Sequence, residues 1–400
     1  MPADSLFDDG ERTNTRPATL SESMFAHLNR TRGPVWERIR ALMDVWWNEH
    51  PASAQANVRG QIRSGDNHAF MAAFFELYGY QVLRRVRDSV IEHPVTQTGR
   101  QPDFLATSDG AAPLVLEMTS TGASPEGRAR AARRNTIYDQ INSWSLPNFW
   151  LHVTLLSEGP GNPPLRRLRR ELEEWIGSLN VDEIDARVTE SNGGYLISES
   201  APRYTWDEAG WSIEFGVLPR SPEMRAPATQ AIGLYGPDAS WVSDVEPIRG
   251  RLADKASAYG DFHGPYVVAV LLNGVGTDDI SVAAALYGDE VYTFPRNDPN
   301  AGQLGRRRNG SWFKPDGWHH TNVSAVLVAS QLLPWTVTST IPTLWHHPAA
   351  MYPVGGVAPL FRQATPNPKT GHIDFLSPTT DPAVFFGLPP DWPGTEPRFD

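Results

Sequence analysis

Apolar side chains recur at the spacing of one helix face, roughly every three or four residues, along several stretches of the chain. Pro34 opens the first of these stretches, which reaches Pro51, and proline is favoured in the first turn of a helix. Further helices are predicted over residues 66–78, 124–144, 164–179 and 246–259. Gly79 is expected to end the helix over residues 66–78, because glycine commonly terminates helices.

Shorter apolar runs predict strands between these helices. One strand is expected over residues 80–86, directly after Gly79. Residues 104–107 and 113–119 are joined by turn-forming residues, so they are predicted to pair as an antiparallel hairpin. Further strands are predicted over residues 148–156, 195–197, 211–218, 291–294 and 323–329.

Residues 266–272 are almost wholly apolar, which is typical of a strand buried on both faces of a sheet. The second half of the chain is therefore expected to extend the sheet begun by the first half. The order of elements predicts an α/β protein with one elaborated domain over residues 34–361. Residues 1–33 are expected to be a flexible segment, and the proline-rich residues 362–400 an extended arm.

Composition narrows the chemistry that the chain can perform. Its 400 residues are 40% hydrophobic and contain 14 tryptophans, enough for one large or two ordinary cores. The chain has no cysteine, which excludes disulfides, thiol nucleophiles and cysteine-ligated metal clusters. Any metal ion must therefore be held mainly by oxygen or imidazole ligands.

Charge and hydropathy limit the partners and the location. The formal net charge of -11 weighs against wholesale coating of nucleic acid, although it leaves room for a local basic groove. The late apolar stretch over residues 323–337 is interrupted by polar residues and is too short to span a bilayer. No apolar leader is visible in residues 1–33, so we expect a cytoplasmic protein without a membrane span.

Two acids lie where the predicted hairpin can bring them together. Asp103 enters one strand, and Glu117 lies in the other with Thr119 on the same face, because strand side chains alternate. Two carboxylates at one end of a sheet suit Mg²⁺, which completes its coordination with water and substrate phosphate. Glu76, one helix earlier, could provide a third acid. The alternative is that Asp103 is a turn residue and Glu117 an ordinary strand-end acid.

These elements resemble the PD-(D/E)XK nuclease superfamily, and within it a bacterial group with an acid in an aromatic-rich helix. The matching segments are Phe75-Glu76-Leu77-Tyr78, Pro102-Asp103-Phe104-Leu105 and Leu116-Glu117-Met118-Thr119. The resemblance is clearest over residues 66–156. It implies a restriction-endonuclease-like mixed sheet flanked by helices, with additional strands and helices. It also implies a Mg²⁺-dependent enzyme that hydrolyses phosphodiesters in DNA or RNA, with Asp103 and Glu117 as metal ligands and Glu76 as an auxiliary acid.

The sequence departs from the superfamily at Thr119, where a lysine is usual two residues after the glutamate. A hydroxyl can bond a water molecule but carries no positive charge. Lys255 lies in a predicted helix of the core, so Thr119 or Lys255 is expected near the attacking water. If neither acts, the fold serves only to bind nucleic acid or a protein partner. A carboxylate-based sugar hydrolase is a third hypothesis, for which no further acid pair is apparent.

Four arginines follow closely on the candidate acids, in the helix predicted over residues 124–144. They could contact phosphates of a nucleic acid, or they could form a solvated helix face. These residues are Arg128, Arg130, Arg133 and Arg134.

Overall fold

The computed structural model describes residues 5–96, 99–122, 124–192, 201–225, 230–235, 245–256, 262–273, 278–355, 357–367 and 370–395. The chain folds into two compact units. Unit 1 comprises Met1–Pro17, Ser23–Gly122 and Val242–Asp400. Unit 2 comprises Ala18–Glu22 and Ala123–Trp241.

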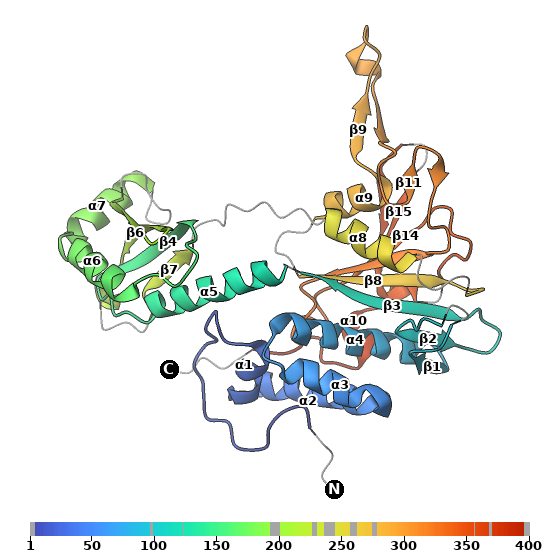
Figure 1. Ribbon diagram of the computed structural model, residues 1–400, viewed down its shortest axis with the longest axis horizontal. Helices are drawn as coiled ribbons and strands as arrows, with labels where there is room; N and C mark the ends of the chain where they lie inside the picture. The colour runs from blue at the N-terminus through green and yellow to red at the C-terminus, as the bar shows by residue number, and fades with distance from the viewer. Residues whose placement is uncertain are drawn as a thin grey trace. The chain divides into compact units, whose positions relative to one another are not determined.

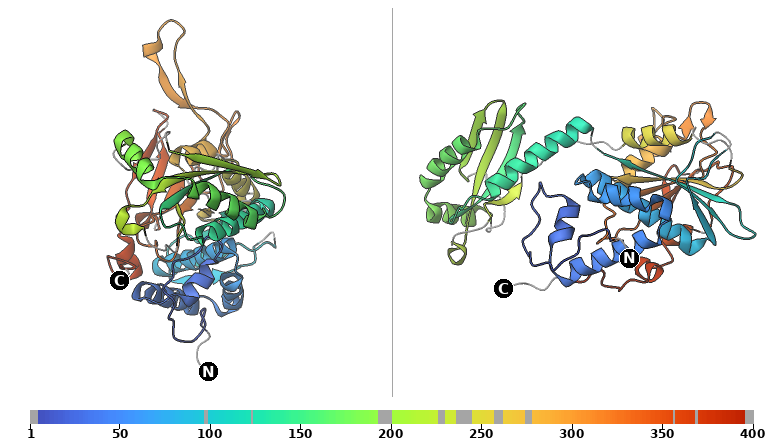
Figure 2. Two further views of the ribbon diagram at one scale, coloured as in Figure 1. Left: turned by 90° about the vertical axis from the view of Figure 1, so that its left-hand side faces the viewer. Right: turned by 60° about the horizontal axis from the view of Figure 1, so that its bottom comes forward.

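Unit 1 is built on a mixed β-sheet flanked by helices (Figures 1 and 2). Within the described residues the sheet has eight strands in the order β1-β2-β3-β8-β13-β14-β15-β16. The parallel neighbours are β3 with β8, β8 with β13, and β14 with β15, and the other pairs are antiparallel. The strands are β1 (Ser89–Glu92), β2 (Phe104–Thr107), β3 (Leu114–Thr121), β8 (Tyr266–Leu272), β13 (Ala325–Ser330), β14 (Thr343–His346), β15 (Arg362–Pro366) and β16 (Ile373–Leu376).

Helices cover both faces of this sheet. Residues of α1 to α4 and α10 pack on one face, and residues of α8 and α9 pack on the other. The helices are α1 (Met24–Arg30), α2 (Pro34–Glu49), α3 (Ala52–Arg63), α4 (Asn67–Val86), α8 (Val245–Ala256), α9 (Asp279–Tyr287) and α10 (Pro382–Phe386), with the short helix η3 (Ala358–Leu360). The prediction of an α/β protein is confirmed.

The central strand β8 explains why one sheet needs two helical layers. All seven of its residues are buried. Val267 and Leu271 pack into the core beneath α4, whereas Val268 and Val270 pack into the core beneath α8. Alternating side chains of one apolar strand thus fill two cores. The prediction that this strand extends the first sheet is confirmed.

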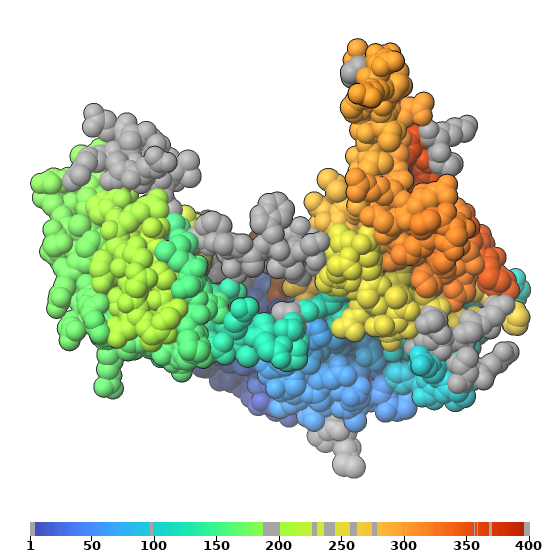
Figure 3. Space-filling view, turned by 45° about the horizontal axis from the view of Figure 1, so that its top comes forward, coloured from blue at the N-terminus to red at the C-terminus, as the bar shows by residue number. Residues whose placement is uncertain are grey.

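Two small hairpins complete unit 1. The hairpin of β9 and β10, with a short helix between them, projects from the rest of the unit (Figure 3). Their bounds are β9 (Glu290–Thr293), η2 (Pro299–Ala301), β10 (Gln303–Arg306), β11 (Phe313–Lys314) and β12 (Gly317–Trp318).

Unit 2 has its own sheet, in the order β5-β6-β4-β7, and its own apolar core, which includes Trp206 and Trp211. This division differs from the single domain predicted over residues 34–361, because β4 and α6 pack into that separate core. The elements are α5 (Pro125–Asn142), β4 (Phe149–Ser157), α6 (Leu165–Gly177), α7 (Val181–Asn192), β5 (Arg203–Glu208), β6 (Trp211–Pro219), η1 (Pro222–Met224) and β7 (Ile232–Tyr235). The strand predicted over residues 195–197 lies outside the described residues.

Helix α4 runs past Gly79 to Val86, so the predicted helix end and the strand predicted over residues 80–86 were wrong. Gly79 serves a different purpose in the structure. A Cβ atom at this position would lie 2.8 Å from the Sδ and Cε atoms of Met118 on β3. The missing side chain therefore lets the middle of α4 lie close to the sheet. Val82 and Leu83, beyond Gly79, are also buried in the core. Tertiary packing thus outweighs the tendency of glycine to end a helix.

Both chain ends also differ from the predictions. Leu6 and Phe7 are buried in the core of unit 1, although residues 1–33 were predicted to be flexible. Residues 362–400 were predicted to form an extended arm, yet they supply β15, β16 and α10. Phe386 of α10 is buried against the ring of Trp46. Apolar side chains in these proline-rich or polar segments anchor them to the core. Among the described residues, no helix combines the length and the apolarity needed to cross a membrane.

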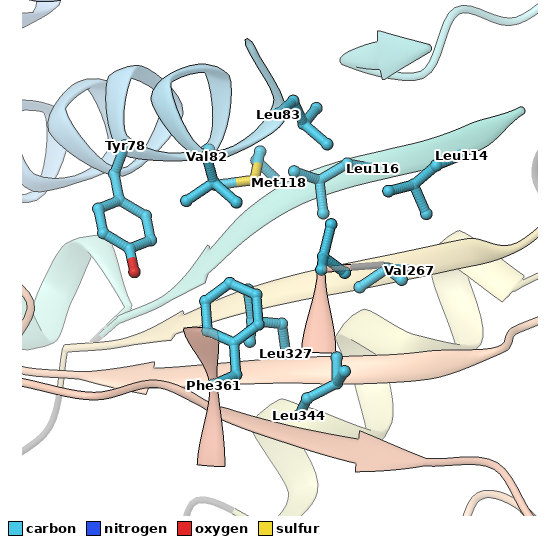
Figure 4. Close-up of a pocket in the computed structure, with 12 residues that line it drawn as sticks. Tyr78, Val82, Leu83, Leu114, Leu116, Met118, Val267, Leu327, Leu344 and Phe361 are labelled. Carbon is cyan, nitrogen blue, oxygen red and sulfur yellow. The ribbon is translucent and has the colours of Figure 1, made fainter. Parts of the chain in front are cut away.

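A small cavity of about 20 Å³ lies between α4 and the sheet (Figure 4). Apolar side chains line it, including Val82, Leu116, Met118 and Phe361. Its size would admit about one water molecule, but the Tyr78 hydroxyl is the one polar side-chain group among the lining residues, whereas a buried water needs about two to four polar partners. We therefore interpret it as a packing void and not as a substrate site.

The close approach of β3 and β8 generates a first prediction. A Cβ atom at Gly264 would lie 2.1 Å from the carbonyl oxygen of Pro113, just before the two strands begin to pair. Gly264→Ala is expected to lower the free energy of unfolding by about 1–3 kcal/mol, measured by urea denaturation. Gly250→Ala is the matched control, because that Cβ atom meets open space on α8 and should stabilise by about 0.5–1 kcal/mol. Equal stability of Gly264→Ala and the wild type would contradict the close pairing.

Candidate functional site

The antiparallel pairing of β2 and β3 places Asp103 and Glu117 side by side. The register pairs Phe104 with Leu116, and the two acids are the next residues beyond that pair. The backbone N–H of Asp103 donates to Oε2 of Glu117 at 3.2 Å. The backbone N–H of Met118 donates to Oδ2 of Asp103 at 2.6 Å. The structure thus holds both predicted metal ligands in place through main-chain donors.

Lys255 reaches this acid pair from a different element. Its Nζ atom forms an ion pair with Oε1 of Glu117. The Glu117 side chain is only 2% exposed, whereas Lys255 is 29% exposed, so the lysine closes the site on its open side. Strand alternation explains the contact, because Glu117 faces the core beneath α8, the helix that ends just after Lys255.

The end of α8 is fixed by two hydrogen bonds. The Tyr266 hydroxyl donates to the carbonyl oxygen of Lys255 at 3.1 Å. The Asn322 side chain donates to the carbonyl oxygen of Ala256 at 2.7 Å. Both bonds satisfy carbonyl groups that a helix end leaves without an internal partner. The backbone from which Lys255 projects is therefore anchored to the sheet.

Thr119 lies two residues beyond Glu117 on β3 and is partly buried. By strand alternation it faces the same side of the sheet as Glu117. At position 119 the strand therefore carries a hydroxyl group. The lysine ammonium group that contacts Glu117 comes instead from Lys255 of α8.

The acids of this region have altered proton affinities. The pKa of Asp103 is raised to about 6, mainly by burial and then by the neighbouring Glu117 carboxylate, while the Met118 N–H and Lys255 act in the opposite direction. Burial also raises the pKa of Glu76 to about 7, with added repulsion from Asp103 and then Glu92. In both acids burial is the larger cause and repulsion from a neighbouring carboxylate the smaller one, so the ionised form of each is disfavoured.

Glu76 belongs to a second group that the sequence did not reveal. In this group Nε2 of His50 lies 3.1 Å from Oε1 of Glu92 and 3.9 Å from Oε1 of Glu76. His50 directly follows α2, Glu76 lies in α4 and Glu92 ends β1. Burial lowers the pKa of His50 to about 4 and raises the pKa of Glu92. The spacing of these residues along the chain carries no motif, so only the fold could identify them.

The four candidate phosphate-binding arginines lie on α5 in unit 2. Arg128 and Arg130 are exposed, whereas Arg133 and Arg134 are partly buried. Nη1 of Arg134 lies 3.7 Å from Oε1 of Glu158. Their binding to nucleic acid stays a prediction.

No family model matches the chain, and no curated protein or solved structure is significantly similar to it.

The raised pKa of Glu76 generates a pH prediction. The folded chain binds this proton more tightly than the unfolded chain, so stability falls as the pH rises from about 4.5 to about 7. Glu76→Gln removes this dependence. We compare the unfolding free energies of the metal-stripped wild type and of Glu76→Gln. The wild-type value minus the variant value should fall by at most about 3 kcal/mol as the pH rises from about 4.5 to about 7.

The measurement is urea denaturation of both chains at several pH values in the presence of a chelator. His50 acts with the opposite sign, since its lowered pKa adds stability as the pH rises from about 4 to 6.5. Both chains contain His50, so its contribution cancels in the difference. A difference that stays constant with pH would show that Glu76 titrates at its ordinary pKa.

Proposed function

We propose that the chain is a metal-dependent, nuclease-like enzyme that hydrolyses phosphodiesters of DNA or RNA. Asp103 and Glu117 bind Mg²⁺ in this proposal, and Lys255 takes the role of the lysine that is absent at position 119. The single observation that supports it most is the ion pair between Lys255 and Glu117. That contact assembles two acids and a lysine from strands and a helix far apart in the sequence.

The donor set suits a hard cation. Asp103 and Glu117 offer carboxylate oxygens, and Mg²⁺ typically takes one or two protein carboxylates plus water and substrate phosphate. Burial and the Glu117 carboxylate raise the pKa of Asp103, so its ionised form is disfavoured. A divalent cation would favour the ionised form, so the residues fit the proposed ion. When bound, such an ion lowers the pKa of a water ligand and stabilises charge on the scissile phosphate.

The order of elements also supports the proposal. Helix α4 carries Glu76, β1 and β2 follow, Asp103 precedes β2, and Glu117 lies in β3. The resemblance to the PD-(D/E)XK superfamily implies this order. Helix α8 then precedes β8, which pairs parallel to β3, so the helix that carries Lys255 packs beside Glu117.

The chain's own residues would divide the chemistry between them. Lys255 is held by Glu117 and can orient the attacking water and stabilise charge on the phosphate oxygens. Glu76 has a pKa of about 7, which suits a group that exchanges protons near neutral pH. Thr119 has only a hydroxyl on the same face, and we propose that it bonds a water molecule of the site.

Three variants test the proposal in a cleavage assay with plasmid DNA, single-stranded DNA and RNA in the presence of Mg²⁺. We expect Asp103→Asn, Glu117→Gln and Lys255→Met each to slow cleavage by about 100-fold or more, because each removes charge from the reacting centre. Matched controls are Asp109→Asn, in the turn between β2 and β3, and Lys314→Met, in β11. Both controls should cleave at the wild-type rate.

Two results would contradict the enzyme proposal. One is cleavage that is equally fast with Lys255→Met and with Lys314→Met. The other is the absence of cleavage together with salt-dependent binding of DNA or RNA, which would favour the catalytically inactive binding module.

A further inference from the structure

We infer that His50, Glu76 and Glu92 form a second metal site, which takes a divalent transition-metal ion such as Zn²⁺. This second site uses other metal ligands than Asp103 and Glu117, and it shares only Glu76 with the proposed nuclease centre. With the second ion bound, the Glu76 carboxylate would be a metal ligand and not the group that exchanges protons. Whether or not the chain cleaves nucleic acid, the site would fasten α2, α4 and β1 to one another.

The geometry of the three ligand atoms fits a small ion. One ligand atom from each residue lies within 4.8 Å of the other two. Nε2 of His50 is 3.1 Å from Glu92 and 3.9 Å from Glu76. Tetrahedral zinc with bonds of about 2.0–2.1 Å places its ligand atoms about 3.3 Å apart. The separations of His50 from the two carboxylates bracket that value, so the imidazole lies near the spacing that such an ion requires on both sides.

Burial makes the site costly without a cation. The side chain of His50 is 0% exposed, that of Glu92 4% and that of Glu76 16%. Within the part of the chain that the structure describes, no lysine or arginine forms an ion pair with Glu76 or Glu92. The two carboxyl groups lie largely buried beside an imidazole, so burial disfavours their ionised forms. A divalent ion would favour those ionised forms and bond all three residues at once.

The surroundings hold the ligands in fixed orientations. The rings of Tyr80 and Phe104 pack edge-on against the His50 imidazole, with centroids 4.9 and 6.2 Å away. The Ser53 hydroxyl donates to Oε2 of Glu92 at 3.3 Å and leaves Oε1 facing His50. A ligand set whose side chains are already held in place loses little entropy on binding. Such preorganisation distinguishes this group from exposed acids that happen to be close together.

The ligand types select the class of ion. Imidazole nitrogen with two carboxylates suits zinc and similar transition metals, whereas magnesium prefers an all-oxygen shell with several waters. The chain has no cysteine, so imidazole is the main nitrogen or thiolate ligand type that it can offer such an ion. Asp103 and Glu117 supply only oxygen, so the two sites are expected to differ in metal preference.

The test uses the full-length chain after a chelator has removed its metal. Titration with Co²⁺ reports tetrahedral coordination through visible absorption, and titration with Zn²⁺ is followed by calorimetry. We expect the wild type to bind one ion with Co²⁺ bands that Zn²⁺ displaces. Glu92→Gln and His50→Gln should each weaken this binding by at least about tenfold. Glu117→Gln and His319→Gln are matched controls outside the site, and they should leave it unchanged.

Folding of each variant is checked by circular dichroism. A measurement on the zinc-loaded wild type needs no variant, because X-ray absorption should show an imidazole nitrogen among the zinc ligands. Absence of Co²⁺ bands, or equal affinity of wild type and Glu92→Gln, would overturn the inference. Retained Co²⁺ binding without Mg²⁺-dependent cleavage would contradict only the proposed function, and cleavage without a Co²⁺ site would contradict only this inference.

Discussion

The candidate site depends on the parallel pairing of β3 with β8. This pairing places Glu117 beside Val268 in the middle of the sheet, beneath α8. Strand alternation turns Glu117 toward that helix, and the anchored end of α8 brings Lys255 onto it. Asp103 joins through the neighbouring antiparallel pair. An interaction between residues 138 positions apart in the sequence is thereby built into the sheet itself.

Excess negative charge is the second constraint on this region. Asp103 and Glu117 share Lys255 on the side of α8, whereas Glu76 and Glu92 lie beside a neutral histidine on the side of α4. Burial is the main cause of the raised pKa values of Asp103 and Glu76, and repulsion from Asp103 adds to the shift of Glu76. Buried acids are tolerated when they lose their charge or gain a cation. Binding of metal ions at these acids would therefore stabilise the folded chain.

The sequence predicted the parts of this arrangement that depend on local geometry. Asp103 and Glu117 could be paired because a short hairpin joins their strands, and Lys255 was singled out because it lies in a predicted helix of the core. His50 and Glu92 could not be found, since they come together only when the end of α2 packs against β1. Gly79 misled the prediction of α4 because a close approach to Met118, and not a helix end, requires glycine there. The separate core of unit 2 likewise depends on long-range pairing of β4 with β6 that periodicity does not reveal.

The most direct test of the central claim moves the lysine within the site. If Lys255 performs the task of the lysine absent at position 119, then Thr119→Lys should restore Mg²⁺-dependent cleavage to a chain that carries Lys255→Ala. Thr119 faces the same side of β3 as Glu117, so a lysine there can approach the same carboxylate. We predict that the double variant cleaves at least about tenfold faster than Lys255→Ala alone. Equal rates for the single and the double variant would contradict the account.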